Sequence, residues 1–110
     1  NHITEQYFSG IDDNTSDYIM EGLMRGLVKA SRAAVANPED YEARSNIMWA
    51  ATQALNKWIC QGVIQDWSTH MIGHELTAYL GMDHARTLAC IQVGCSVLVI
   101  IIAASAALPV

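Results

Sequence analysis

Basic residues are scarce in this sequence of 110 residues, which has six Lys and Arg against eleven Asp and Glu and a formal net charge of −5. The six basic residues are scattered and form no stripe interleaved with aromatic side chains. Proteins bind nucleic acids through clustered positive charge, so the sequence argues against a nucleic-acid partner. Cys60, Cys90 and Cys95 show no CxxC spacing and are odd in number. They indicate reduced thiols of a cytoplasmic protein rather than a disulfide framework.

The beginning of the chain lacks the features of a secretory signal. Asn1 stands where an initiator Met would be, and no charged segment followed by an apolar one comes after it. Residues 1–9 read instead as the end of a helix whose beginning is missing, closed by Ser9 and Gly10. We therefore expect this sequence to be a fragment of a longer cytoplasmic protein.

Strand patterns are missing as well. No segment alternates apolar and polar residues between Gly or Asn hairpin turns, whereas several segments carry apolar residues at helical spacing. We therefore predict an all-α fold, with helices over 14–36, 37–62 and 66–81 and a further helix that opens at His84.

Local signals support these boundaries. Asn37 is a good N-cap residue, and Pro38 suits the first helical position, so we expect the second long helix to start there and to stop at Gly62. Glu21 and Arg25 form a favourable i,i+4 pair. Gly22 and Gly26 each cost about 1 kcal/mol relative to Ala inside a helix. They therefore predict a close helix crossing.

Four histidines are the candidate functional residues. His70 and His74 are four residues apart and project from one face of a helix, and His84 follows the Gly81 break. Neutral imidazoles bind Zn²⁺ or Fe²⁺, so spacing alone offers His70 and His74 as a chelating pair. For such a pair taken alone, partly buried histidines satisfied by hydrogen bonds are the favoured interpretation. The run HMIGHE is neither HExxH nor HxxEH, which excludes the zinc peptidases that carry these motifs.

The residues around these histidines carry a resemblance to a known family. HITEQY at 2–7, NIMWAATQALN at 46–56 and QDWSTHMIGHELTAYLGMDHARTLA at 65–89 resemble the iron-containing alcohol dehydrogenases, in particular the NADPH-dependent butanol dehydrogenase and aldehyde reductase subgroup. The resemblance implies a piece of the C-terminal helical, metal-binding domain, which has a dehydroquinate synthase-like fold. It extends over residues 1–89, and the apolar segment 90–110 departs from the family pattern.

The resemblance also changes the assignment of the histidines. It implies that His70 and His84 bind the metal, that His2 is a third ligand, and that His74 lies near the substrate as a proton-relay or positioning group. The fourth ligand of the family, an aspartate, would lie four residues before His2 and thus outside this sequence. Either Fe²⁺ or Zn²⁺ accepts such ligands.

The activity implied for the intact parent is hydride transfer between a small alcohol or aldehyde and NADP or NAD. The cofactor-binding α/β domain of the family precedes the helical one, and this sequence contains no glycine-rich phosphate-binding loop. We therefore expect the segment alone to be inactive. The resemblance is compatible with a homodimeric parent. A non-enzymatic helical metal-binding module is the alternative function.

The end of the sequence permits a different alternative. Residues 88–110 carry no charged side chain, and their length and composition match a transmembrane helix. No Lys, Arg or aromatic flank follows them, however. A truncation or a loss of reading frame explains this tail equally well, so membrane anchoring is the secondary reading. The tryptophans, among them Trp49 and Trp58, are expected in the core, with Trp67 as the candidate for a substrate pocket.

Overall fold

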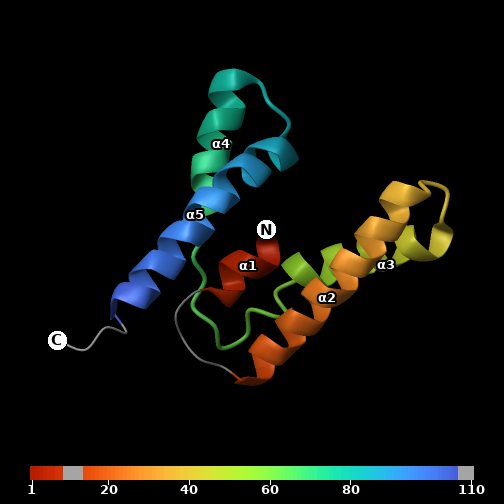
Figure 1. Cartoon of the computed structure of the whole chain (residues 1–110), viewed down its shortest axis with the longest axis horizontal. Coiled ribbons are helices and arrows are strands. Elements are labelled where there is room, and N and C mark those ends of the chain that lie inside the picture. The colour runs from red at the N-terminus through yellow and green to blue at the C-terminus, as the bar shows by residue number, and fades with distance from the viewer. Residues whose placement is uncertain (9–13, 107–110) are drawn as a thin grey trace. The chain divides into compact units, whose positions relative to one another are not determined.

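The regular secondary structure of the described residues is helical. The computed structural model describes the backbone of residues 1–8 and 14–106 and the side chains of residues 1–8 and 15–98. Every regular element in these ranges is a helix, which confirms the predicted all-α class (Figure 1). The chain divides into two compact units, one comprising His2–Gln65 (the N-terminal unit) and one running from Asp66 onward together with Asn1 (the C-terminal unit).

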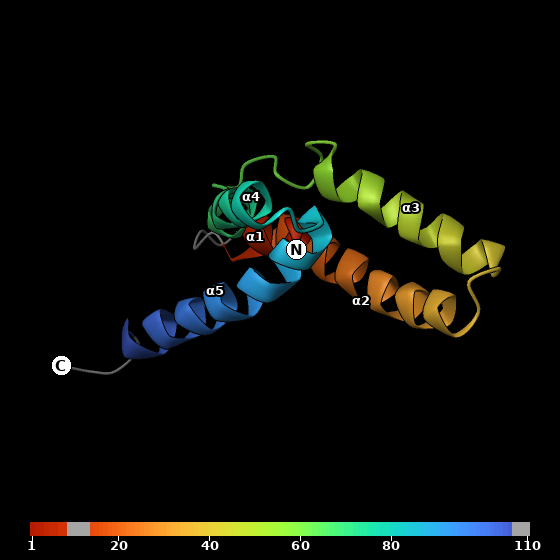
Figure 2. The same ribbon diagram turned by 90° about the horizontal axis from the view of Figure 1, so that it is seen from above.

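The N-terminal unit contains three helices: α1 (His2–Tyr7), α2 (Asn14–Ala36) and α3 (Tyr41–Leu55). The two long helices α2 and α3 lie side by side and run in opposite directions, and α1 contacts both (Figures 1 and 2). Residues from all three helices and from the segment after α3 share a small apolar core of Ile3, Met20, Ala54 and Ile59. The expected helix over 14–36 is confirmed at both ends. The predicted close of the first helix at Ser9-Gly10 lies outside the described residues.

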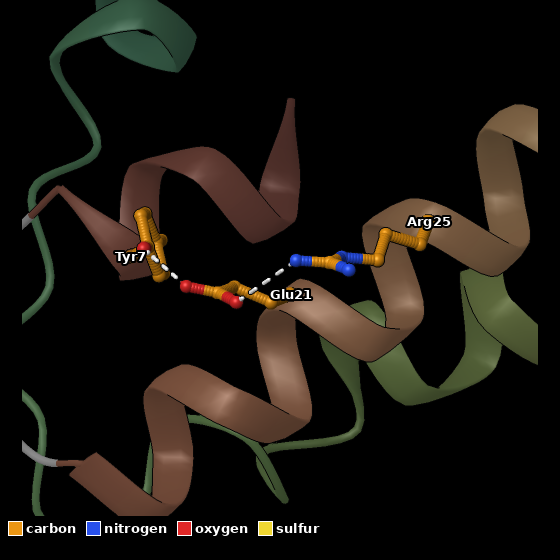
Figure 3. A network of polar contacts seen from close by, with 3 residues as sticks. All are labelled: Tyr7, Glu21 and Arg25. Carbon is orange, nitrogen blue, oxygen red and sulfur yellow. Dashed lines mark hydrogen bonds and ion pairs between the residues drawn. The ribbon is translucent and has the colours of Figure 1, made fainter.

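A polar network joins α1 to α2 on the surface of the N-terminal unit (Figure 3). Arg25 Nη2 lies 3.6 Å from Glu21 Oε2, which confirms the predicted i,i+4 pair. The Tyr7 hydroxyl donates to Glu21 Oε1 at 2.9 Å. This hydrogen bond to a carboxylate raises the pKa of Tyr7 above its ordinary value of 10.0, because it stabilises the protonated phenol.

The start of α3 differs from the prediction. Asn37 does not cap the helix, because its Oδ1 accepts the Glu39 N–H at 3.2 Å within a turn. The N-cap is Asp40, whose extended backbone (φ −67°, ψ 100°) lets its carboxylate accept the Ala43 N–H at 2.9 Å. Both Asn and Asp favour N-cap positions. The sequence therefore predicted the capping segment correctly, but the predicted cap residue, Asn37, was wrong.

The end of α3 also comes earlier than Gly62. The helix stops at Leu55, and Lys57 then adopts a left-handed backbone with a φ of 70°. The Asn56 Oδ1 accepts the Trp58 N–H at 3.0 Å, a side-chain bond that competes with continuation of the helix. Asn at this point therefore ends the helix about two turns before Gly62.

Gly22 and Gly26 do not mark a close helix crossing. No described atom lies within 4 Å of a Cβ built at either glycine. Both line an open groove between α2 and α3 with a volume of about 500 Å³. Trp49 lines the same groove and is 65% exposed, and Trp58 is also exposed, so the prediction of core tryptophans is wrong at these two positions.

The C-terminal unit is a helical hairpin of α4 (Ser68–Leu80) and α5 (His84–Ala106). Asp66 precedes α4, and its carboxylate accepts the Ser68 N–H at 2.8 Å and the Ser68 hydroxyl. Gly81 ends α4 in a left-handed conformation with a φ of 64°, and its N–H bonds the Thr77 carbonyl. The predicted stop at Gly81 and the new helix at His84 are therefore confirmed, whereas α4 begins at Ser68, two residues after the predicted start at 66.

Residues 90–106 of the apolar tail continue α5 without a break in the helix. The predicted division between residues 89 and 90 falls inside α5, so it remains a prediction about where the family pattern ends. Among the described residues, no helix has the length and hydropathy needed to cross a bilayer. The membrane-span alternative for 88–110 thus gains no support from the described part of that segment, and residues 107–110 lie outside it. The three cysteines are free, as expected.

Candidate metal centre

Three histidines of the C-terminal unit lie together. His70 and His74 occupy adjacent turns of one face of α4 because they are four residues apart. Gly81 reverses the chain, and the next helix opens at once with His84. The ring centroid of His84 lies 5.3 Å from that of His70 and 4.7 Å from that of His74, and the His70 and His74 centroids are 6.1 Å apart.

The angles between the rings separate the three possible pairs. His74 and His84 are stacked, with only 6° between their planes. The lone pairs of imidazole nitrogens lie in the ring planes, and parallel planes do not meet. These two rings therefore cannot share one ion in this arrangement at a metal–nitrogen distance of about 2.1 Å. His70 is tilted by 59° to His84 and by 56° to His74, so either of these pairs can direct its nitrogens to a common point.

Burial distinguishes the two remaining pairs. His70 is buried, with 6% of its surface exposed, and His84 is half-buried, whereas His74 is exposed. Among the described residues, the buried Nδ1 of His84 has no hydrogen-bond partner. A buried polar atom without a partner is unfavourable and calls for an explanation, such as a cation or an ordered water at that position. The pair of His70 and His84 thus fits a metal ion better than the pair of His70 and His74.

The ligand set is incomplete within the hairpin. In the part of the chain that the structure describes, no group of three or more His, Cys, Asp or Glu side chains is arranged to hold a metal ion. His2, the third expected ligand, is half-buried at the start of α1 and belongs to the N-terminal unit. Its assignment as a ligand therefore rests on the family resemblance alone.

The neighbours of the histidines follow the sequence expectations in part. The Trp67 ring meets His70 edge to face, with centroids 5.1 Å apart, so this tryptophan borders the cluster, and its place in a substrate pocket stays a prediction. Glu75 is exposed. The Asp83 carboxylate pairs with Arg86 at 3.5 Å, and both side chains are largely exposed. The Asp83 side chain therefore takes part in a surface ion pair.

Three residues that the sequence did not single out hold the hairpin together beside the cluster. A Cβ built on Gly73 would lie 3.0 Å from Leu88 Cδ2, so the missing side chain allows α4 and α5 to approach. The Thr77 and Thr87 hydroxyl oxygens are 3.0 Å apart, and the Thr87 hydroxyl donates to the His84 carbonyl at 2.8 Å. The spacing of these residues could have indicated this contact. Gly73 and Thr77 are four residues apart on one face of α4, and Thr87 lies one turn after His84.

Comparison with known proteins decides the family. The model of the Fe-containing alcohol dehydrogenase family, C-terminal region, matches residues 1–94 of the 110. The chain belongs to this family. The resemblance carried by the histidine motif and its flanks is thereby confirmed.

The relatives that this chain matches are named as an aldehyde reductase and butanol dehydrogenases. It is 52% identical over 89 residues to the NADPH-dependent aldehyde reductase YqhD of Escherichia coli, an alignment that covers 80% of this chain and 23% of that protein. It is 39% identical over 89 residues, with the same coverage, to the NADH-dependent butanol dehydrogenase A of Clostridium acetobutylicum. The crystal structure of Escherichia coli YqhD superposes with a TM-score of 0.76, covering 80% of this chain and 23% of that one. The chain thus spans about a quarter of the length of these relatives.

Proposed function

We propose that this chain is the metal-binding part of an NAD(P)-linked alcohol dehydrogenase or aldehyde reductase, and that His70 and His84 are its principal metal ligands. The observation that supports this most directly is the pairing of a buried His70 with a His84 whose buried Nδ1 has no hydrogen-bond partner among the described residues. Membership in the iron-containing family supports a divalent metal, Fe²⁺ or Zn²⁺. His2 is proposed as the third ligand.

Each histidine has its own role in this proposal. A divalent metal held by these side chains would supply Lewis-acid chemistry to the oxygen of an alcohol or aldehyde. His70, buried against the Trp67 ring, holds its imidazole in one orientation for ligation. His74 is exposed and stacked on His84, which keeps it outside the ligand pair but beside it. We assign His74 the transfer of a proton to or from the substrate oxygen, or the orientation of that oxygen.

The nicotinamide is assigned to a part of the parent protein that this chain does not include. The characterised relatives are NADPH- or NADH-dependent by name, and the chain covers 23% of their length. The cofactor carries the hydride, while the protein orients cofactor and substrate. We therefore propose that the parent interconverts small alcohols and aldehydes with NADP or NAD, and that the 110-residue chain alone does not.

Metal binding by the chain tests the ligand assignment. Co²⁺ or Zn²⁺ titration of the 110-residue chain is expected to show binding that His70→Ala and His84→Ala each abolish. His74→Phe is the matched control, because it keeps a ring to stack on His84 and removes both nitrogens. Unchanged affinity in His74→Phe supports the proposal. Loss of binding in His74→Phe with retention in His84→Ala would instead establish the His70 and His74 chelate that spacing alone suggests.

Activity measurements test the assignment to an enzyme. The purified chain is expected to give no NADPH- or NADH-linked reduction of a short aldehyde, with or without added Fe²⁺ or Zn²⁺. A fusion in which the 110 residues replace the matching segment of the Escherichia coli aldehyde reductase tests whether the chain supports activity in a whole enzyme, since the two are 52% identical there. A fusion that binds metal and has no turnover would favour the non-enzymatic metal-binding module. Turnover by the isolated chain would overturn the expected inactivity.

A further inference from the structure

A pair of threonine hydroxyls connects the two helices that carry the histidine cluster. Thr87 lies one turn into α5, is completely buried at 0% exposure, and donates its hydroxyl proton to the His84 carbonyl at 2.8 Å. Its oxygen lies 3.0 Å from the hydroxyl oxygen of Thr77 on α4. A hydroxyl has only one proton to give. The donors of both hydrogen bonds are therefore fixed: Thr77 donates to Thr87, and Thr87 donates to the carbonyl of His84.

These two hydrogen bonds, from Thr77 through Thr87 to the His84 carbonyl, form a relay that lies beside the histidine cluster. Thr77 lies on the face of α4 that carries His70 and His74, three residues beyond His74. The acceptor at the other end is the backbone of His84 itself. The relay thus ties the first turn of α5 to the histidine-bearing face of α4. The close approach of the two helices at Gly73, where a Cβ would meet Leu88 at 3.0 Å, lies beside it and leaves that turn little freedom to shift.

An ordinary threonine back-bond does not have these properties. Thr52 in α3 also donates to a carbonyl in its own helix, that of Met48 at 2.9 Å. That bond is exposed and stays within one helix, so it satisfies a hydroxyl that water could equally satisfy. The Thr87 hydroxyl is inaccessible to water and has partners on two helices. Its removal takes away the acceptor of the half-buried Thr77 hydroxyl and the buried donor to the His84 carbonyl, and lost hydrogen bonds of this kind are unfavourable.

We propose that Thr87, through Thr77, is a positioning residue for the metal ligand His84. The inference rests on the proposed function, because it requires His84 to be a ligand. Metal sites demand ligand positions accurate to a fraction of an ångström, and losing an outer hydrogen bond that orients a ligand costs about 10- to 100-fold in metal affinity. We expect the Thr87 hydroxyl to act in this range, because it fixes the backbone from which the His84 ring projects.

Co²⁺ binding to the full 110-residue chain tests the proposal. Thr87→Val removes the hydroxyl and keeps the shape, and it is expected to weaken Co²⁺ binding by about tenfold or more and to change the visible Co²⁺ spectrum. Thr87→Ser restores the hydroxyl and is expected to recover both the affinity and the spectrum. Thr52→Val makes the same chemical change at an exposed back-bond in the N-terminal unit, and it is expected to bind Co²⁺ like the wild type. A purely structural role of Thr87 would lower the unfolding temperature without altering the spectrum of the bound ion.

The outcomes separate this proposal from the proposed function. Loss of Co²⁺ binding in His84→Ala, together with wild-type affinity and spectrum in Thr87→Val, would overturn the positioning role and leave the ligand assignment standing. Equal binding, or no binding, by the wild type and His84→Ala would overturn both. Should circular dichroism show that Thr87→Val does not fold, Thr77→Val decides, because it removes only the bond between the helices at a half-buried site. Wild-type Co²⁺ affinity in Thr77→Val overturns the proposal, and a loss of about tenfold supports it.

Discussion

The imidazole rings of His74 and His84 lie face to face, with centroids 4.7 Å apart and planes 6° apart. This stack brings together residues from two helices that meet at a glycine turn. It also gives the two rings different roles, because parallel rings cannot direct their lone pairs at one ion. The exposed ring of the pair, His74, remains accessible from outside the hairpin, whereas the Nδ1 of its neighbour is buried.

The stack should contribute to the stability of the hairpin. Aromatic pairs contribute about 0.5–1.5 kcal/mol beyond their buried area, and an exposed pair belongs at the lower end. We expect His74→Ala to lower the free energy of unfolding by about 0.5 kcal/mol or more, and His74→Phe to retain most of it. Urea unfolding followed by circular dichroism measures both. Equal stability of the Ala and Phe variants would mean that the stacking contact does not contribute to the free energy of unfolding.

The sequence predicted this hairpin well because its signals are local and unambiguous. Gly81 is the one residue between α4 and α5 that readily takes a positive φ, so the end of α4 and the start of α5 could be placed from it. Histidine spacing then identified a cluster but not its internal geometry. Whether His84 stacks on His74 or tilts against it depends on the angle between the helices, and spacing along the chain does not encode that angle.

Prediction failed where one residue type has two structural uses. Gly22 and Gly26 suggested a close helix crossing, yet both border an open groove, while the tight approach is at Gly73. A glycine in a helix leaves space where a side chain would be. Whether a neighbouring helix packs into that space depends on the tertiary structure, which the glycine itself does not reveal. Asn37 and Asp40 are likewise both capable caps, and the choice between them is made by backbone angles that the sequence does not reveal.

Two substitutions distinguish the observed start of α3 from the predicted one. Asp40→Ala removes the carboxylate that accepts the Ala43 N–H, and it is expected to lower the free energy of unfolding by about 1 kcal/mol. Asn37→Ala removes only an exposed turn contact and is expected to cost much less. Urea unfolding of the two variants gives the comparison. A larger loss in Asn37→Ala would restore Asn37 as the cap.

Asp66 should make the stability of the C-terminal unit depend on acid pH. Hydrogen bonds from the Ser68 side chain and backbone lower the pKa of Asp66 below its ordinary value of 3.8, because they stabilise the carboxylate. A depressed folded-state pKa contributes stability above pH 3.8 that is lost as the pH falls through the folded-state value. Asp66→Asn should therefore be less stable than wild type near neutral pH, and the gap should shrink in acid. A gap that stays constant from about pH 6 to pH 2 would contradict this linkage.

Gly73 and Gly26 form a matched pair for testing how closely α4 and α5 approach. Both are helical, so replacement by Ala brings the same intrinsic gain of about 1 kcal/mol. No described atom lies within 4 Å of a Cβ at Gly26, and Gly26→Ala should realise that gain as a higher free energy of unfolding. At Gly73 the added methyl would lie 3.0 Å from Cδ2 of Leu88, which is only 6% exposed and has little room to move.

Overpacking of this kind costs about 1–3 kcal/mol, so Gly73→Ala should be neutral to destabilising despite its better helix propensity. Urea unfolding of the two single variants measures the difference in sign. Leu88→Ala removes the atom that the new methyl meets, so adding Gly73→Ala to a Leu88→Ala background should recover the gain seen at Gly26. A Gly73→Ala variant as stabilised as Gly26→Ala, with no dependence on the Leu88 background, would mean that the hairpin can open around the methyl. In that case the close approach of α4 and α5 would not constrain the position of His84.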